Sequence, residues 1–153
     1  MELNLIEDYN LSYQKAYQMQ KKLFSLRQEN KIPDTLFLTS HPHVITMGRS
    51  GDEANLLINE ELLEEENIEV VSIERGGDVT YHGPGQIVGY PILDLNNFRQ
   101  DLHYYVRKLE QIIIDLLAEY NIEAGRIEGL TGVWVDDEKI TAIGIAARKW
   151  VTM

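Results

Sequence analysis

The residues best suited to chemistry lie in a glycine-rich stretch at positions 75–86. Four of its twelve residues are glycine, and the polar residues among them are Arg75, Thr80, Tyr81, His82 and Gln86. Glycines cluster where the backbone takes a positive φ angle or where another molecule lies against it. A plain hairpin loop also contains glycines, but it does not need so many polar side chains. The stretch therefore predicts a ligand-binding segment. No Gly-Lys-Ser/Thr sequence follows it, so a nucleotide phosphate loop is not predicted.

Two other groups of residues could do chemistry. Lys139 ends the polar run Asp136–Lys139, where a lone lysine is ordinarily a solvated charge in a turn. His41 and His43 lie two residues apart, which is a weak pattern for metal ligands, and we predict no metal site. His82 has two interpretations. It is either a hydrogen-bonded residue that shapes a pocket wall, or a group that transfers a proton.

The spacing of apolar residues predicts the helices that position these groups. A loose 3.6-residue period runs from Ser12 to Asn30, and a regular apolar stripe runs from Leu102 to Tyr120. A short helix is expected around Leu62 and Leu63. We expect the helix over 102–120 to pack on a sheet.

Strands are predicted where short β-prone runs are bounded by turn residues. The runs are Leu36–Thr39, Val44–Met47, Val70–Ile73, Ile87–Leu95, Thr131–Val135 and Ile140–Ile145. The first two are expected to be neighbours, Pro91 indicates an edge or a bulge, and the last two predict a hairpin whose turn carries Lys139. Strands outnumber helices and do not alternate with them. The pattern therefore predicts an α+β fold, a mixed, largely antiparallel sheet with packed helices, in a single domain over residues 1–153.

The charge balance and the cysteine count exclude several kinds of function. The chain has 14 basic and 25 acidic residues, a net charge of −11, which disfavours binding to nucleic acid or to an anionic membrane surface. No apolar run approaches the length of a membrane span, and the first residues lack the pattern of a signal peptide, so we expect a cytoplasmic protein. There is no cysteine, so this chain supplies no thiol nucleophile of its own.

Residues 75–86 resemble the signature of the lipoyl(octanoyl) transferases, Arg-Gly-Gly-x-x-Thr-Tyr-His-Gly-Pro-Gly-Gln. Two further segments are similar to family segments in the same order and spacing: His41–Arg49, and Gly132–Val135 continuing through Lys139–Gly144. The resemblance implies the superfold of the biotin and lipoate ligases and the octanoyltransferases. It also implies an acyltransferase that moves an octanoyl group from acyl carrier protein to a lysine of a lipoyl domain, without a cofactor.

The resemblance also implies roles for particular residues. In the family a cysteine forms an acyl thioester, and a lysine lowers the pKa of that thiol; Lys139 stands at the position of this lysine. A nearby cation favours the thiolate, which is the nucleophile. The residues that match the acyl-binding positions of the family are Arg75, Gly76, Gly77, Asp78, Val79, Thr80, Tyr81, His82, Ala142, Ile143 and Gly144.

The chain departs from the family pattern at its C-terminal end. The nucleophilic cysteine of the family lies in a Pro-Cys-Gly-like segment downstream of the position of Met153, and the run Trp150–Met153 is β-prone up to the last residue. We therefore expect an incomplete octanoyltransferase that cannot form the thioester alone, or a chain whose thiol comes from elsewhere. Two alternatives remain: an ATP-dependent lipoate or biotin protein ligase, which needs no cysteine, and a non-catalytic acyl-binding module.

The expected partners follow from the same resemblance. They are octanoyl-acyl carrier protein as donor, and the lipoyl domains of 2-oxoacid dehydrogenase complexes or the glycine cleavage H protein as acceptor. These partners are typically acidic, so a protein of net charge −11 must meet them through a local basic patch. The candidates for this patch are Arg49, Arg75, Lys139, Arg148 and Lys149. The run Glu60–Glu74, with seven glutamates and no basic residue, is expected to be a solvated surface away from the site.

Overall fold

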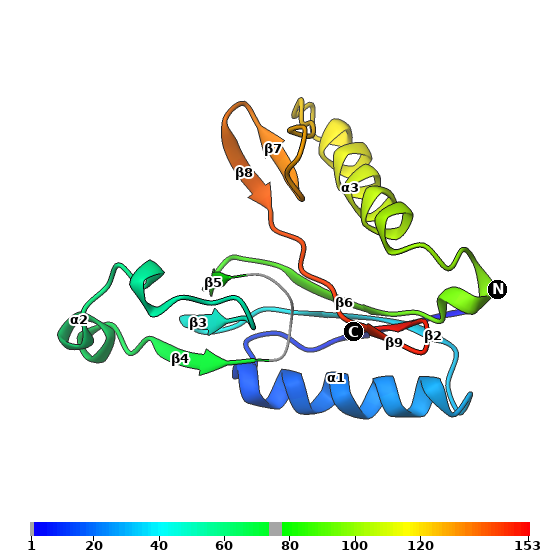
Figure 1. Ribbon diagram of the computed structural model, residues 1–153, viewed down its shortest axis with the longest axis horizontal. Coiled ribbons are helices and arrows are strands. Elements are labelled where there is room, and N and C mark those ends of the chain that lie inside the picture. The colour runs from blue at the N-terminus through cyan, green and yellow to red at the C-terminus, as the bar shows by residue number, and fades with distance from the viewer. Residues whose placement is uncertain (1, 74–77) are drawn as a thin grey trace. The chain divides into compact units, whose positions relative to one another are not determined.

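The computed structural model describes residues 2–73 and 78–153 of the chain. The chain forms two compact units, and the colour bar of Figure 1 locates the residues of each. Unit 1 comprises residues 1–94 and 145–153, and unit 2 comprises residues 95–144. No helix within the described residues is both long enough and apolar enough to cross a membrane.

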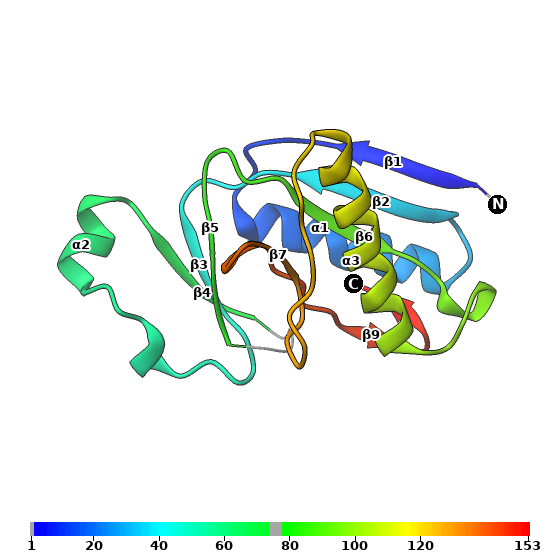
Figure 2. The same cartoon turned by 90° about the horizontal axis from the view of Figure 1, so that it is seen from above.

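Unit 1 is built on a three-stranded sheet in the order β1–β2–β6. β1 (Leu3–Glu7) runs parallel to β2 (Asp34–Thr39), and β6 (Val88–Ile92) runs antiparallel to β2. Helix α1 (Tyr13–Gln28) lies along one face of this sheet (Figures 1 and 2) and contacts β2 and β6. Its buried positions recur every three or four residues, so they lie on one face of the helix: Tyr13, Ala16, Gln20, Leu23 and Arg27. The core between them consists of Ala16, Leu23, Phe37, Ile92 and Val151.

A second three-stranded sheet of unit 1 has the order β4–β3–β5. β3 (Val44–Met47) pairs in parallel with β4 (Glu69–Ser72) and antiparallel with β5 (Val79–His82). The connection from β3 to β4 contains the short helices η1 (Glu53–Asn55) and α2 (Glu60–Glu65). This sheet carries the part of the glycine-rich stretch that the structure describes.

The last residues of unit 1 form a ribbon of β9 (Ala147–Arg148) and β10 (Val151–Thr152). Thr152 fastens β10 to the end of β6. Its hydroxyl accepts the N–H of Leu93 at 2.9 Å and donates to the carbonyl of Pro91 at 2.7 Å, while its own N–H donates to the Leu93 carbonyl. Thr152 is 1% exposed, so these bonds satisfy a buried hydroxyl.

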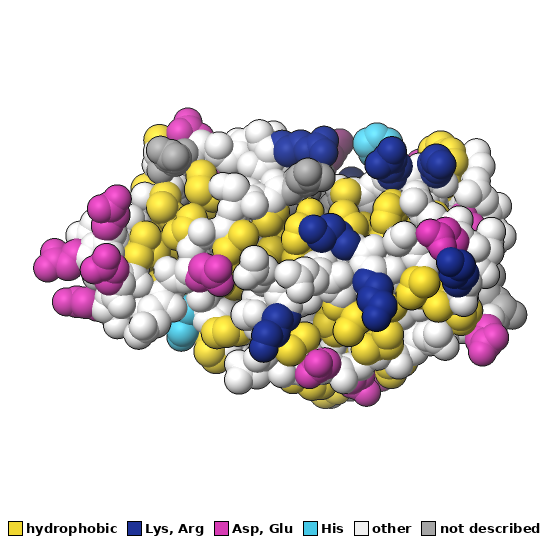
Figure 3. Space-filling view, turned by 90° about the horizontal axis from the view of Figure 1, so that it is seen from below, with side chains coloured by type: hydrophobic (Ala, Val, Ile, Leu, Met, Phe, Trp, Pro, Cys, Tyr) yellow, Lys and Arg dark blue, Asp and Glu magenta, His cyan; other side chains and the backbone are white. Residues whose placement is uncertain are grey.

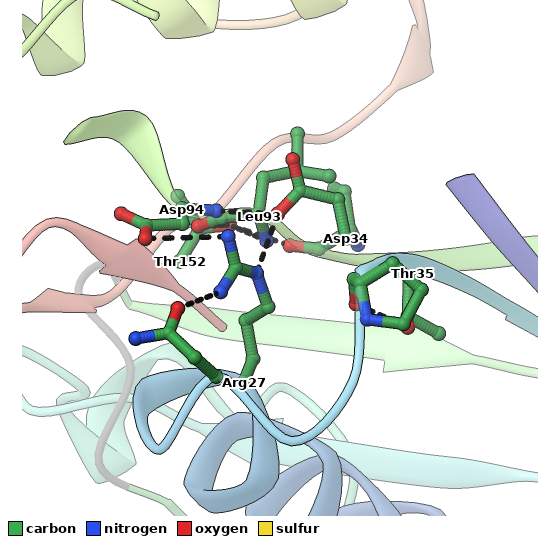
Figure 4. A network of polar contacts seen from close by, with 9 residues as sticks. Arg27, Asp34, Thr35, Leu93, Asp94 and Thr152 are labelled. Carbon is green, nitrogen blue, oxygen red and sulfur yellow. Dashed lines mark hydrogen bonds and ion pairs between the residues drawn. The ribbon is translucent and has the colours of Figure 1, made fainter. Parts of the chain in front are cut away.

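A buried ion-pair network lies beside the hydrogen bonds of Thr152 (Figure 4). The guanidinium of Arg27 contacts Asp34 Oδ1 at 2.7 Å and Asp94 Oδ2 at 3.3 Å, and it donates to the side chain of Asn30 at 2.8 Å. Asp34 Oδ1 also accepts the backbone N–H of Asp94 at 2.9 Å. One cation thus joins the end of α1, the start of β2 and the end of β6.

Unit 2 contains η2 (Leu95–Asn97), α3 (Leu102–Glu119) and a hairpin of β7 (Val133–Val135) and β8 (Glu138–Thr141). The Asp101 side chain caps α3 by accepting the N–H of Tyr104 at 2.9 Å. The helix contacts β7. The helix that we expect to pack on a sheet thus packs on the two-stranded sheet of this hairpin.

The three α-helices within residues 2–73 and 78–153 end in the same way. The chain reverses through an asparagine with positive φ, and the next residue donates its N–H to a carbonyl five residues earlier. Asparagine tolerates the left-handed region better than most residues, which favours it at this position. The asparagines are Asn30, Asn67 and Asn121, and the bonds run from Lys31 to Leu26, from Ile68 to Leu63 and from Ile122 to Leu117.

The predicted α+β class with mixed, largely antiparallel pairing is confirmed, but some details are wrong. β2 and β3 are not neighbours, because the turn at residues 40–43 carries the chain from one sheet to the other. The second hairpin strand ends at Thr141 rather than Ile145. Pro91 lies on β6, an edge strand of its sheet, as predicted. β1, β5 and β9 were not predicted.

Candidate functional site

The described part of the glycine-rich stretch, residues 78–86, contains strand β5, and the pleat of this strand divides its side chains between two faces. Thr80 lies opposite Thr46 and His82 opposite Val44, so these residues share one face of the sheet. Val79 and Tyr81 point to the other face. The predicted acyl-binding residues of β5 therefore do not form one continuous surface.

On the first face, His82 packs into a cluster of rings. Its imidazole stacks on Tyr13 of α1, with ring centroids 6.2 Å apart, and meets His41 edge-on at 5.5 Å. The His82 Nδ1 atom is 2.7 Å from Gln86 Oε1. Because Gln86 donates its Nε2–H to the Tyr81 carbonyl, its oxygen faces His82 and the His82 Nδ1 carries the donated proton.

The Gly-Pro-Gly-Gln sequence explains why Gln86 returns to His82. The N–H of Gln86 donates to the Gly83 carbonyl at 3.1 Å, which closes a four-residue turn. Pro84 occupies the second position, where its fixed φ is favourable, and Gly85 occupies the third with φ of 84°. Only the third position needs glycine for a positive φ. The turn thus sets the orientation of the histidine before it.

His41 belongs to the same cluster of rings as Tyr13 and His82, and it is buried, with 1% of its surface exposed. Its Nδ1 donates to the Leu11 carbonyl at 2.8 Å, and its Nε2 accepts the hydroxyl of Tyr90 at 2.9 Å. Burial lowers the pKa of His41, and the bond to the Leu11 carbonyl only partly opposes this effect. His41 is therefore a neutral packing residue. Among the described residues there is no group of three or more candidate metal ligands.

The lowered pKa of His41 predicts a loss of stability in mild acid. Below an ordinary histidine pKa of about 6.5, the unfolded chain binds a proton that the native ring resists. The free energy of unfolding should therefore fall as the pH drops from about 7 to about 5. H41N keeps a donor and cannot be protonated, so it should flatten this dependence in denaturant titrations. The exposed H103N variant is the control; an equal pH dependence in H41N and the wild type would contradict this assignment.

Asp78 acts as an anchor for the loop that follows β3. Its carboxylate accepts the N–H of Asp52 at 3.2 Å and the side-chain amide of Asn55 at 2.5 Å. Its carbonyl accepts the N–H of Gly48 at 3.0 Å. These bonds account for an aspartate at this position without a ligand.

The second face of β5 borders an apolar groove of about 550 Å³. On the wall of this groove, the Tyr81 hydroxyl lies 2.5 Å from His43 Nδ1. The groove is lined by His43, Ile45, Asn55, Leu56, Leu57, Ile58, Glu66, Ile68, Val79 and Tyr81. Val79 and Tyr81 thus contribute to a surface separate from the one that carries His82.

In unit 2, Lys139 lies on strand β8 opposite Trp134 of β7. The predicted placement of Lys139 in the turn is wrong, because the turn consists only of Asp136 and Asp137, with φ of 52° at Asp136. The Nζ of Lys139 stands 4.7 Å from the centroid of the Trp134 ring. Ala142, Ile143 and Gly144 follow β8 in a segment without regular structure.

The sequence does not predict a role for Glu110 of α3, which bonds to Gly132 at the start of this hairpin. Glu110 is 0% exposed, and its carboxylate accepts the N–H of Gly132 at 3.0 Å, Arg107 Nη1 at 2.7 Å and Arg126 Nε at 2.8 Å. Burial by itself would raise the pKa of Glu110, but these three hydrogen bonds outweigh it and hold the pKa below its usual range. The one signal in the sequence was a glutamate beside the apolar stripe of the helix.

The sequence-predicted residues therefore fall into five groups. Val79 and Tyr81 line the groove on one face of β5, and Asp78 bonds to the loop after β3. Thr80 and His82 share one face in unit 1, whereas Lys139 and residues 142–144 belong to unit 2. Arg75, Gly76 and Gly77 lie outside the described residues.

Comparison with known protein families identifies the family of this chain. Residues 12–153 match the lipoyl protein ligase A/B catalytic domain. The chain belongs to this family. Solved structures with a similar fold include lipoate protein ligases. The bi-partite ligase of Thermoplasma acidophilum has a TM-score of 0.72 at 16% identity, covering 99% of this chain and 59% of that one. A lipoate-protein ligase A bound with ATP has a TM-score of 0.72 at 15% identity, covering 99% and 64%. At this identity they show a common fold only.

Curated relatives are far more similar in sequence. A protein of Solibacter usitatus named octanoyltransferase is 53% identical over 142 residues, covering 93% of this chain and 64% of the relative. An octanoyltransferase of Caldicellulosiruptor saccharolyticus is 51% identical, covering 100% of this chain and 66% of the relative. The chain thus spans just under two thirds of the length of these relatives.

Proposed function

We propose that this chain carries the lysine and the acyl-binding strand of an octanoyltransferase, which moves an octanoyl group from acyl carrier protein to a lysine of a lipoyl domain. The observation that carries the proposal is about 50% identity to proteins named octanoyltransferase over nearly the whole chain. The ligase alternative is less favoured, because these curated relatives are named octanoyltransferase and not ligase.

The surroundings of Lys139 suit the proposed role. Its ammonium lies over an aromatic face, and within the described residues it forms no ion pair with a carboxylate. A cation that is not already neutralised can stabilise a neighbouring thiolate, which is the form of cysteine that attacks a thioester. Residues 1–153 contain no cysteine, so the thiol in this proposal comes from outside them.

We propose acyl-binding residues in each unit, taken by itself: residues 75–77, Thr80 and His82 in unit 1, and Ala142–Gly144 in unit 2. Glycines in both segments allow an extended alkyl chain to lie against the backbone. Each buried methylene contributes about 0.8 kcal/mol, so a chain of about seven such units contributes roughly 5 kcal/mol before the cost of ordering it. In this proposal Thr80 and His82 line the site, and the ring cluster holds His82 in place.

The charge distribution is compatible with an acidic partner. Figure 3 shows acidic side chains gathered at the end of the molecule formed by α2, away from most Lys and Arg side chains on the same face. An acidic carrier protein or lipoyl domain would be repelled from the α2 end and attracted to a basic region. We propose that such a partner contacts Arg49, Arg75, Arg148 and Lys149 in unit 1 and Lys139 in unit 2, each unit taken by itself, and we propose the cytoplasm as the compartment.

A fusion protein tests the proposed function. A C-terminal segment of an octanoyltransferase, chosen to contain the Pro-Cys-Gly-like sequence of the family, is joined after Met153 to supply a cysteine. With octanoyl-acyl carrier protein and a lipoyl domain, mass spectrometry should detect an octanoylated lysine without ATP. Pyrophosphate release that requires octanoate and ATP would instead identify a ligase. Octanoate binding with no transfer in either assay would identify an acyl-binding module.

A further inference from the structure

We propose that Glu110 is a positioning residue for Lys139, acting through Gly132 and Arg126 to fix the hairpin that holds the lysine. The importance of this role for acyl transfer rests on the proposed function, but the positioning itself does not. All the residues involved lie in unit 2.

Glu110 gathers donors from three separate places in the chain. Arg107 comes from the same helix, whereas Arg126 and Gly132 lie before and at the start of the hairpin. Oε1 accepts from Gly132, and Oε2 accepts from both guanidinium groups. A fully buried carboxylate with three donors is held in one position.

Gly132 lies close to the side chain of Lys139, so the position of Gly132 affects the position of the lysine. The φ of Gly132 is 135°, and a Cβ atom built on this glycine would lie 2.5 Å from the Thr141 carbonyl oxygen and 3.4 Å from Lys139 Cε. The backbone at Gly132 therefore lies directly against β8 and against the stem of the lysine. A shift of Gly132 must move one or both.

Arg126 constrains the other edge of β7, the edge that does not pair with β8. Its neighbour Gly125 exchanges two backbone hydrogen bonds with Trp134, at 2.8 and 2.9 Å. Trp134 in turn is the residue whose ring lies under the Lys139 ammonium. Glu110 thus holds the backbone on both sides of the Trp134–Lys139 pair.

The donor count explains why a carboxylate is needed. Glutamine has the same shape, but it offers one oxygen and places an NH₂ donor where the second oxygen was. With three donors facing it, E110Q must direct its amide donor at another donor. Either the Gly132 bond or the arginine bonds are then lost.

Nuclear magnetic resonance of the 153-residue chain tests the proposal. The Lys139 ε-methylene protons should be shifted upfield by the ring current of Trp134, and W134L identifies this contribution. E110Q should lose more than half of the shift, with increased solvent exchange of the Gly132 amide. E119Q, an exposed acid on the same helix, should retain the full shift. A folded E110Q with an unchanged Lys139 shift would overturn the proposal.

A second variant covers the case in which E110Q does not fold. R126Q removes one partly exposed donor and leaves Glu110 bonded to Arg107 and Gly132, so it should lose a smaller part of the Lys139 shift. If R126Q folds and Lys139 is unaffected, the proposal is wrong. Because the readout is the position of Lys139 in the free chain, failure of octanoyl transfer in the fusion would leave this test intact.

Discussion

The R27M substitution is expected to lower the free energy of unfolding by about 3–5 kcal/mol, because it leaves buried carboxylates without their cation. Asp34 is 5% exposed, and its side chain lies 2.7 Å from the Arg27 Nε; Asp94 lies on the other side of the same guanidinium. Methionine replaces much of the volume of arginine but none of its donors. Urea denaturation followed by circular dichroism measures the change.

An exposed arginine provides the control for R27M. Arg99 also pairs with an aspartate, Asp101, but its side chain is 62% exposed. An ion pair in water contributes about 0–1 kcal/mol, so R99M should change stability by no more than this. If R27M is no more destabilising than R99M, the network of Figure 4 does not fasten α1 to β2 and β6 as we describe.

The K139M substitution should have the largest effect on transfer. In the fusion protein it removes the proposed partner of the thiolate, and we expect kcat to fall about 10²–10⁴-fold, the usual range for a group that controls a proton at the reacting centre. The KM for octanoyl-acyl carrier protein should change much less. Steady-state assays with a lipoyl domain as acceptor measure both constants.

Lys108 gives a matched control for K139M. Its ammonium also lies over an aromatic ring in unit 2, 5.4 Å from the centroid of Tyr104. K108M therefore removes a lysine in a similar setting without touching the hairpin, and its kcat should equal that of the parent fusion. Equal rates in K139M and K108M would remove Lys139 from the proposed mechanism.

Much of the fold could be predicted from local patterns. The periods of residues 12–30 and 102–120 gave both long helices to within two residues at each end, because burial of one helix face dictates the spacing. The resemblance carried by residues 75–86 is confirmed by the family match. β5 was missed, because four alternating residues between glycines look like a loop.

Features that depend on distant pairing could not be predicted. β2 and β3 are close in sequence but pair with partners far along the chain, so their separation into two sheets has no local signal. Four consecutive polar residues predict a turn that includes Lys139. In the structure, the positive φ of Asp136 closes the turn with only two residues, so Lys139 lies on β8. The donors to Glu110 come from residues 107, 126 and 132, and nothing in the sequence links them.

The proposal that this chain contributes the lysine and acyl strand, and not the thiol, is tested most directly by intact-mass measurement after incubation with octanoyl-acyl carrier protein. The fusion should gain one octanoyl group on its cysteine that hydroxylamine removes, and the 153-residue chain should gain none. A hydroxylamine-labile octanoyl adduct on the 153-residue chain, or its absence from a folded fusion, would contradict the account.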